Sequence, residues 1–145
     1  VILSEMSKYF EDESKARIFV IEQFERKLRN LICQRIRMSR KANLQEWNYF
    51  ITFTYDNNLH TEETFKKQLY NRLSLFASRK DWKYIGVWER GKGTNRLHFH
   101  GIFSIPEGTM PGELIETNDY SFRAKKRQIT LQNTYFNTYF GRSDF

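Results

Sequence analysis

The sequence predicts an α+β fold, in which an antiparallel β-sheet carries helices on one face and follows a long N-terminal amphipathic helix. Two observations predict it. Apolar residues recur every three or four positions in two stretches, as in helices that bury one side. Runs of β-branched and aromatic residues, separated by turn residues, indicate strands and hairpins. We expect the helix to occupy residues 1–44 and the sheet domain residues 45–145.

The first predicted helix runs from residue 13 to about residue 40. Its stripe repeats at steps of three and four residues, and we expect it to pack on the domain or on a partner helix. The members are Ile21, Phe24, Leu28, Leu31, Arg35 and Met38, of which Arg35 alone is polar.

Charge is unevenly distributed along this helix. The acidic residues lie at or before Glu25, and no acidic residue occurs from Arg26 to Gln45. The basic block that follows is either a solvated face or a surface that follows a phosphate backbone. It contains Arg26, Lys27, Arg29, Arg35, Arg37, Arg40 and Lys41.

Residues 49–55 form the next predicted element, a central strand rich in aromatic and β-branched residues. Thr61 caps a helix with two glutamates in its first turn, where negative charge suits the helix dipole. We expect that helix to bury Phe65, Leu69, Leu73 and Phe76.

Residues 83–89 and 96–103 form two predicted strands joined by the turn at residues 90–95, and therefore an antiparallel hairpin. Successive strand side chains point to opposite faces, so His98 and His100 share one face. Leu97, Phe99 and Phe103 share the other, predicted to be the core side. We expect Thr52 and Thr54 on the face of the histidines.

The two histidines are candidate ligands for one divalent cation. A register that pairs Trp88 with Leu97 and Gly86 with Phe99 places Glu89 opposite Arg96, on the face of the histidines and diagonal to His98. A slip of one residue would move Glu89 to the other face. Two imidazoles and one carboxylate leave coordination positions for water or substrate. The alternative is that both histidines are solvent-exposed and bind nothing.

The C-terminal third contains a predicted strand at residues 113–120 and a basic cluster formed by Arg123, Lys125, Lys126 and Arg127. Residues 132–140 are predicted to form a short helix that ends at Gly141. This helix places Tyr135 and Tyr139 one turn apart on the same side.

Composition favours a polyanionic partner. The net charge is +7 and aromatic residues make up 17% of the chain, which suits binding to nucleic acid and stacking of unpaired bases. Cys33 is the single cysteine, which excludes an intramolecular disulfide and a cysteine-rich zinc site. No apolar run is long enough to span a membrane, and we expect a cytoplasmic protein. Because the chain begins at Val1 and stops at Phe145, we expect it to be part of a longer protein whose sheet domain is truncated at its C-terminus.

The motifs resemble a known superfamily. His98-Phe99-His100 is similar to the His-hydrophobe-His motif of HUH endonucleases, and residues 50–55 resemble their first motif. Glu89 stands where several of these replication proteins supply a third ligand. The run from residue 84 to residue 103 looks most like replication initiators of gokushovirus-like microviruses and related small replicons. The resemblance covers about residues 48–145 and implies an RRM-like, ferredoxin-like sheet.

The resemblance implies initiation of rolling-circle replication at an origin in single-stranded DNA, in the cytoplasm of the host if the protein is viral. Members use Mg²⁺ or Mn²⁺ to polarise the scissile phosphate, and a tyrosine attacks to give a 5′-phosphotyrosine and a free 3′-OH. By this resemblance His98, His100 and Glu89 ligate the metal, and Arg96 contacts a phosphate. Thr52 and Thr54, with the basic residues Arg35, Arg37, Arg40, Lys125, Lys126 and Arg127, are the other candidate DNA contacts, and host replication proteins are candidate partners.

The tyrosine departs from the family pattern. Tyr135 and Tyr139 have the spacing of paired catalytic tyrosines, but no lysine follows them and Gly141 breaks the helix. Either is a weak candidate nucleophile, and we expect the nucleophile to lie beyond Phe145. Three other functions stay open: a single-strand transposase of the same superfamily, a metal-free nucleic-acid-binding module, and a non-haem iron oxygenase.

Overall fold

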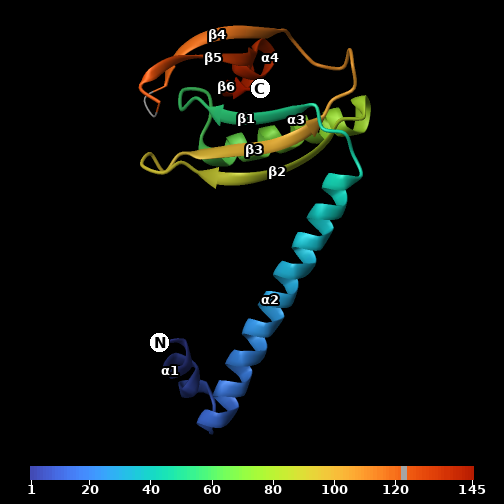
Figure 1. Ribbon diagram of the computed structural model, residues 1–145. Helices are drawn as coiled ribbons and strands as arrows, with labels where there is room; N and C mark the ends of the chain where they lie inside the picture. The colour runs from blue at the N-terminus through green and yellow to red at the C-terminus, as the bar shows by residue number, and fades with distance from the viewer. Residues whose placement is uncertain (122–123) are drawn as a thin grey trace. The chain divides into compact units, whose positions relative to one another are not determined.

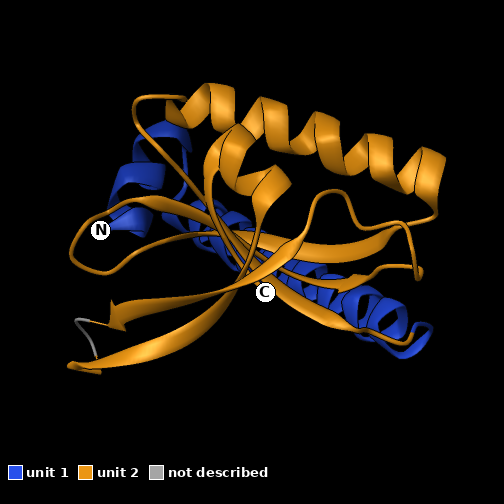
Figure 2. Cartoon of the chain, turned by 90° about the horizontal axis from the view of Figure 1, so that it is seen from above, with its two compact units in different colours: residues 1–45 blue, residues 46–145 orange. Residues whose placement is uncertain are grey.

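The computed structural model describes residues 1–121 and 124–145. It divides into two compact units, Val1–Gln45 and Glu46–Phe145 (Figures 1 and 2). Arg123, a member of the predicted basic cluster, lies outside the described residues. Within those residues, no helix combines the length and the apolar character needed to cross a bilayer.

Unit 1 is helical. It comprises α1 (Ile2–Met6), a short 3-10 helix (Ser7–Tyr9) and α2 (Glu13–Asn43), which confirms the predicted long helix. The Asp12 carboxylate caps α2 by accepting a hydrogen bond from the Ser14 N–H. Ala16 is fully buried where α1 and the 3-10 helix pack on the start of α2.

The predicted stripe of α2, called the α2 stripe below, is a continuous line of exposed side chains. Its five apolar members keep between 48% and 59% of their surface exposed. The α2 stripe consists of Ile21, Phe24, Leu28, Leu31, Arg35 and Met38.

Unit 2 confirms the predicted α+β class with a six-stranded antiparallel sheet of order β2-β3-β1-β6-β5-β4. In chain order its elements are β1 (Tyr49–Tyr55), α3 (Glu62–Lys80), β2 (Lys83–Arg90), β3 (Leu97–Ser104), β4 (Leu114–Ser121), β5 (Lys126–Asn133), α4 (Thr134–Phe140) and β6 (Gly141–Asp144). Without the β4–β5 hairpin, the order is the βαββαβ of ferredoxin-like folds.

Local sequence explains where the two helices of unit 2 begin and end. Thr61 and Thr64 form a capping box at the start of α3, and Asp81 ends that helix in the left-handed conformation. The Asn133 side chain accepts a hydrogen bond from the Phe136 N–H and caps α4. Gly141 ends α4 with φ +122°, and a Cβ there would lie 2.7 Å from the Asp56 nitrogen, so only glycine fits.

The hydrophobic core lies between one face of the sheet and the two helices. The Phe53 ring on β1 contacts Phe136 of α4, whose ring contacts Phe76 of α3. Every second residue of β3 is buried, beginning with Leu97, as the strand pattern predicted. Both helices therefore cover the same face, which leaves the other face of β1 and β3 to polar side chains.

Two C-terminal strands were not predicted. Gln132 and Asn133 belong to β5, so the prediction that a helix begins at residue 132 is wrong by two residues. β5 has only Ile129 and Leu131 as apolar members and begins with basic residues, so its pattern alone is weak. It becomes a strand because it pairs along its whole length with β4.

The predicted hairpin register is also wrong, by two residues. Trp88 pairs with Phe99 and Gly86 with Gly101, because strand pairing extends to Arg90 and Leu97 before the turn begins. The hydrogen bond from the Gly91 N–H to the Arg96 carbonyl closes that turn. A shift of two residues preserves the alternation of faces, so Glu89 still lies on the face of the histidines.

Candidate metal and nucleic-acid site

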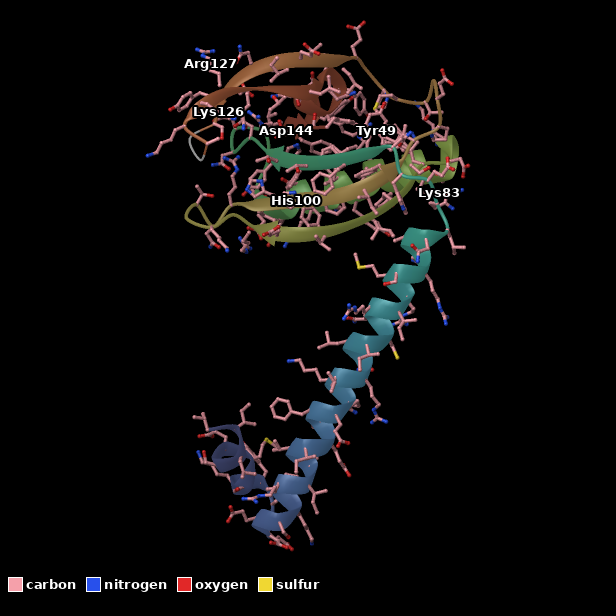
Figure 3. All side chains as sticks on the ribbon, viewed as in Figure 1. Tyr49, Lys83, His100, Lys126, Arg127 and Asp144 are labelled. Atoms are coloured by element: carbon pink, nitrogen blue, oxygen red, sulfur yellow. The ribbon has the colours of Figure 1, made fainter. Side chains whose placement is uncertain are left out.

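A cleft of about 940 Å³ lies on the polar face of the sheet, opposite the face covered by α3 and α4. Its walls come from β1, β2, β3, β6 and the turn after β2. In Figure 3, His100 on β3 and Asp144 on β6 are labelled, on the two strands that flank β1. The lining residues are Thr52, Thr54, Glu89, Gly91, Lys92, His98, His100, Arg142 and Asp144.

Each cleft histidine is paired across the strands with one threonine. Thr52 stands opposite His100, and Thr54 opposite His98. In both pairs the threonine Oγ1 lies 2.9 Å from the histidine Nδ1. When Nδ1 donates this hydrogen bond, Nε2 keeps its lone pair for another ligand.

Glu89 approaches His100 rather than His98. Its backbone lies opposite His98, but its Oε2 is 3.6 Å from the Nε2 of His100, on the diagonal. The two imidazole rings are 6.0 Å apart, centre to centre, and nearly parallel. The structure thus brings all three predicted metal ligands into one cleft.

These groups are not closely convergent. Within residues 1–121 and 124–145, no three His, Cys, Asp or Glu side chains are arranged closely enough to form a metal centre. The Glu89 side chain is 65% exposed, whereas that of His100 is 26% exposed. The carboxylate is therefore the least constrained of the three groups.

Electrostatics keep His98 neutral. Burial is the main cause that lowers its pKa, and the nearby His100 and Arg96 lower it further, against a smaller opposing effect of Glu89. Neutral imidazole is the form that binds metal ions, so these neighbours favour the ligating state.

Arg96 lies beside this cleft. Its guanidinium stacks over the Tyr55 ring at 4.9 Å, and it lines a neighbouring cleft of about 520 Å³ that also includes Thr54 and Arg142. Among the described residues, Arg96 Nε is a buried side-chain atom that lacks a hydrogen-bond partner. A guanidinium in this state is suited to bind an anionic ligand.

The other predicted DNA contacts lie on two separate elements. Lys125, Lys126 and Arg127 are exposed at the turn between β4 and β5, where Figure 3 labels the last two. Arg35, Arg37 and Arg40 are exposed on α2, in unit 1.

The two candidate tyrosines lie on the opposite face from the histidines. Tyr135 and Tyr139 do share one side of α4, with rings 4.7 Å apart. Arg72 of α3 donates a hydrogen bond to the Tyr135 hydroxyl at 2.9 Å and places its guanidinium 4.2 Å from the Tyr139 ring. Both tyrosines therefore pack with α3, across the sheet from the cleft.

Arg142 and Asp144 are cleft residues that the sequence did not single out. Arg142 donates to Asp144 through Nε and Nη2, and its Nη1 lies 2.8 Å from Asp119 Oδ2 on β4. These two carboxylates raise the pKa of the guanidinium. The spacing of two between Arg142 and Asp144 places them on one face, but a strand of four residues after a helix-ending glycine is too short to be predicted from its pattern.

Comparison with known proteins gives one match. Residues 48–141 match the model of a family described as replication-associated protein ORF2. The matched range contains Glu89, His98 and His100 and ends just before Arg142. No curated protein and no solved structure shows a significant similarity to the chain.

Proposed function

The chain belongs to the replication-associated protein ORF2 family, and from this premise we propose that its cleft nicks and rejoins single-stranded DNA at a rolling-circle origin. The observation that carries the proposal is the pair of cleft histidines, each with Nδ1 held by a threonine and with Glu89 beside them. Such anchoring is typical of histidines that ligate a metal through Nε2.

The chemistry of these donors fits a divalent cation. Two imidazoles and one carboxylate suit Mn²⁺ well and Mg²⁺ acceptably, and they leave positions for water and phosphate oxygens. His98, His100 and Glu89 would hold the ion, with the exposed Glu89 side chain turning to complete the set. When bound, such an ion supplies Lewis-acid polarisation of the scissile phosphate.

The protein's own cations would hold the DNA strand. Lys92 and Arg142 line the cleft, and Arg96 lies at its edge. Their charges suit the phosphates on either side of the scissile bond, while Thr52 and Thr54 keep the imidazoles oriented. The basic residues of α2 and of the β4–β5 turn would add contacts to the phosphate backbone.

We propose that the nucleophile is a tyrosine other than Tyr135 or Tyr139, because both lie on the helix-covered face. In the reaction a tyrosine oxygen forms a bond to phosphorus, the bond to the 3′-oxygen breaks, and that oxygen takes up a proton. The 5′-phosphotyrosine conserves the energy of the phosphodiester for rejoining.

A second candidate is a metal-free module that binds single-stranded DNA. It is favoured by the lack of any closely convergent set of three ligands in the described part of the chain. In that case the histidines would serve only as hydrogen-bonding groups on a polar surface.

A titration with Mn²⁺ separates the two candidates. We expect Mn²⁺ to raise the melting temperature of the protein, and His100→Ala to abolish that shift, because ligand binding to the native state alone stabilises it. His60→Ala is the matched control, since His60 contacts the Tyr139 carbonyl and lies outside the cleft. In the full-length protein, His100→Ala should also abolish Mn²⁺-dependent nicking of origin single strands.

The outcomes are distinct. No thermal shift in the unaltered protein, or an equal shift in His100→Ala, would refute the metal site and leave the DNA-binding module. A shift that depends on His100 without any nicking by the full-length protein would retain the metal site but refute the nuclease.

A further inference from the structure

The α2 stripe is an apolar seam along an exposed helix. Its members follow one another at steps of three, four, three, four and three residues from Ile21 to Met38. This is the spacing of the a and d positions of a coiled coil, which pack into the matching positions of another helix. The 31-residue length of α2 gives room for the whole seam.

Exposure of the stripe points to a partner. Phe24, Leu28 and Leu31 keep 54%, 59% and 53% of their surface exposed. A long helix in water depends on burial of its apolar side more than on intrinsic propensity. A contiguous apolar patch on a surface of otherwise charged residues is typical of an interaction site.

We propose that the α2 stripe binds the α2 stripe of a second copy of this chain, with the two helices antiparallel. This inference does not rest on the nuclease proposal. It concerns an element outside the cleft, and the two proposals can fail separately.

Charge along α2 selects the antiparallel direction. Residues 11–25 hold five acidic and two basic residues, for a net charge of −3, whereas residues 26–41 hold seven basic and no acidic residues, for +7. A parallel pair would place the two basic halves side by side. An antiparallel pair places each basic half along the acidic half of the other copy, which is electrostatically favourable.

Arg35 within the stripe supports the same direction. In a parallel, in-register pair, Arg35 of one helix would face Arg35 of the other, with like charges inside the seam. In the antiparallel pair centred between Leu28 and Leu31, Arg35 instead faces Phe24 of the second copy and lies near its Glu25. A guanidinium is stabilised by an aromatic face and by a carboxylate.

Sedimentation of residues 1–145 over a wide concentration range tests self-association. We expect a reversible dimer, and Leu28→Glu should raise its dissociation constant roughly a hundredfold, because it buries an unpaired charge in the seam. Asn30→Glu is the matched control, since it lies about 200° around the helix from Leu28. Leu28 is exposed, so the monomer should keep its helical circular dichroism.

Disulfide cross-linking tests the direction. In a Cys33→Ser background, Ile18→Cys and Ser39→Cys proteins are oxidised separately and as a mixture. The antiparallel pair places position 18 of one copy near position 39 of the other, so the mixture should cross-link far more than either protein alone.

Three results would overturn the proposal. They are a monomer at every concentration, a dimer that Leu28→Glu leaves intact, and efficient cross-linking of the Ser39→Cys protein to itself. The first two would show that the stripe does not associate with a second copy, and the third would show a parallel pair.

Discussion

Each cleft histidine depends on one threonine of the neighbouring strand for its orientation. The Thr54 hydroxyl lies 2.9 Å from the Nδ1 of His98, and Thr52 makes the matching contact to His100. A group that fixes the tautomer and the ring orientation of a ligand affects metal affinity without touching the metal. Residues beside the ligands are therefore part of the proposed site.

Thr54→Val tests this dependence at the scale of one residue. The change removes the hydroxyl and keeps the shape, and we expect the affinity for Mn²⁺ to fall about 10–100-fold. Isothermal titration calorimetry measures it. Thr138→Val is the control, because Thr138 is exposed on α4, on the other face of the sheet. Unchanged affinity in Thr54→Val would show that the threonine does not orient the ligand.

At the scale of elements, the β2–β3 hairpin is built around a glycine. Gly86 lies under the Phe99 ring, and a Cβ at residue 86 would stand 2.1 Å from Phe99 Cζ. The ring fills the space that a side chain on β2 would need. This contact supports the strand that carries both histidines.

We expect Gly86→Ala to lower the free energy of unfolding by about 1–3 kcal/mol, because the added methyl group overpacks the core against Phe99. Urea denaturation measures the change. In a Phe99→Leu background the same substitution should cost less, since the smaller side chain leaves room. Equal costs in the two backgrounds would contradict the predicted clash.

Helix α4 belongs to the core and not to the cleft. Tyr135→Phe and Tyr139→Phe should therefore leave nicking by the full-length protein unchanged. Tyr135→Phe should cost about 1 kcal/mol of stability, because it removes the hydrogen bond from Arg72. Nicking assays and urea denaturation together check both effects. Loss of nicking in either variant, with stability preserved, would identify that tyrosine as the nucleophile.

At the scale of the whole molecule, the net charge of +7 predicts salt-dependent binding of single-stranded DNA. Each contact to a phosphate of a single strand contributes about −0.7 to the slope of log affinity against log salt. Arg37 and Arg40 lie about 200° and 140° around α2 from Arg35, so they point away from the α2 stripe. They remain available to DNA when two stripes associate.

We expect the double variant Arg37→Gln/Arg40→Gln to reduce that slope by about 1.4. Fluorescence anisotropy at several salt concentrations measures it. Lys67→Gln/Arg79→Gln on α3 removes the same charge from exposed positions on the helix-covered side and should change the slope little. Equal effects of the two double variants would show that α2 contributes only general charge.

The sequence by itself determined the elements and faces that depend on local patterns. The alternation in β3 placed both histidines on one face, because successive strand side chains point in opposite directions. The same alternation kept Glu89 on that face although the predicted register was two residues off. Capping by Thr61 and the periodic residues of α2 and α3 likewise fixed those helices from near neighbours alone.

Only the tertiary structure decided which distant groups meet. β6 is four residues long and becomes part of the cleft because it pairs with β1, which brings Arg142 and Asp144 beside the histidines. Tyr135 and Tyr139 have the spacing of a catalytic pair, yet α4 packs on the face of the sheet opposite the cleft. Long-range strand pairing and the choice of face for a helix depend on contacts between segments far apart in the chain, which local patterns do not specify.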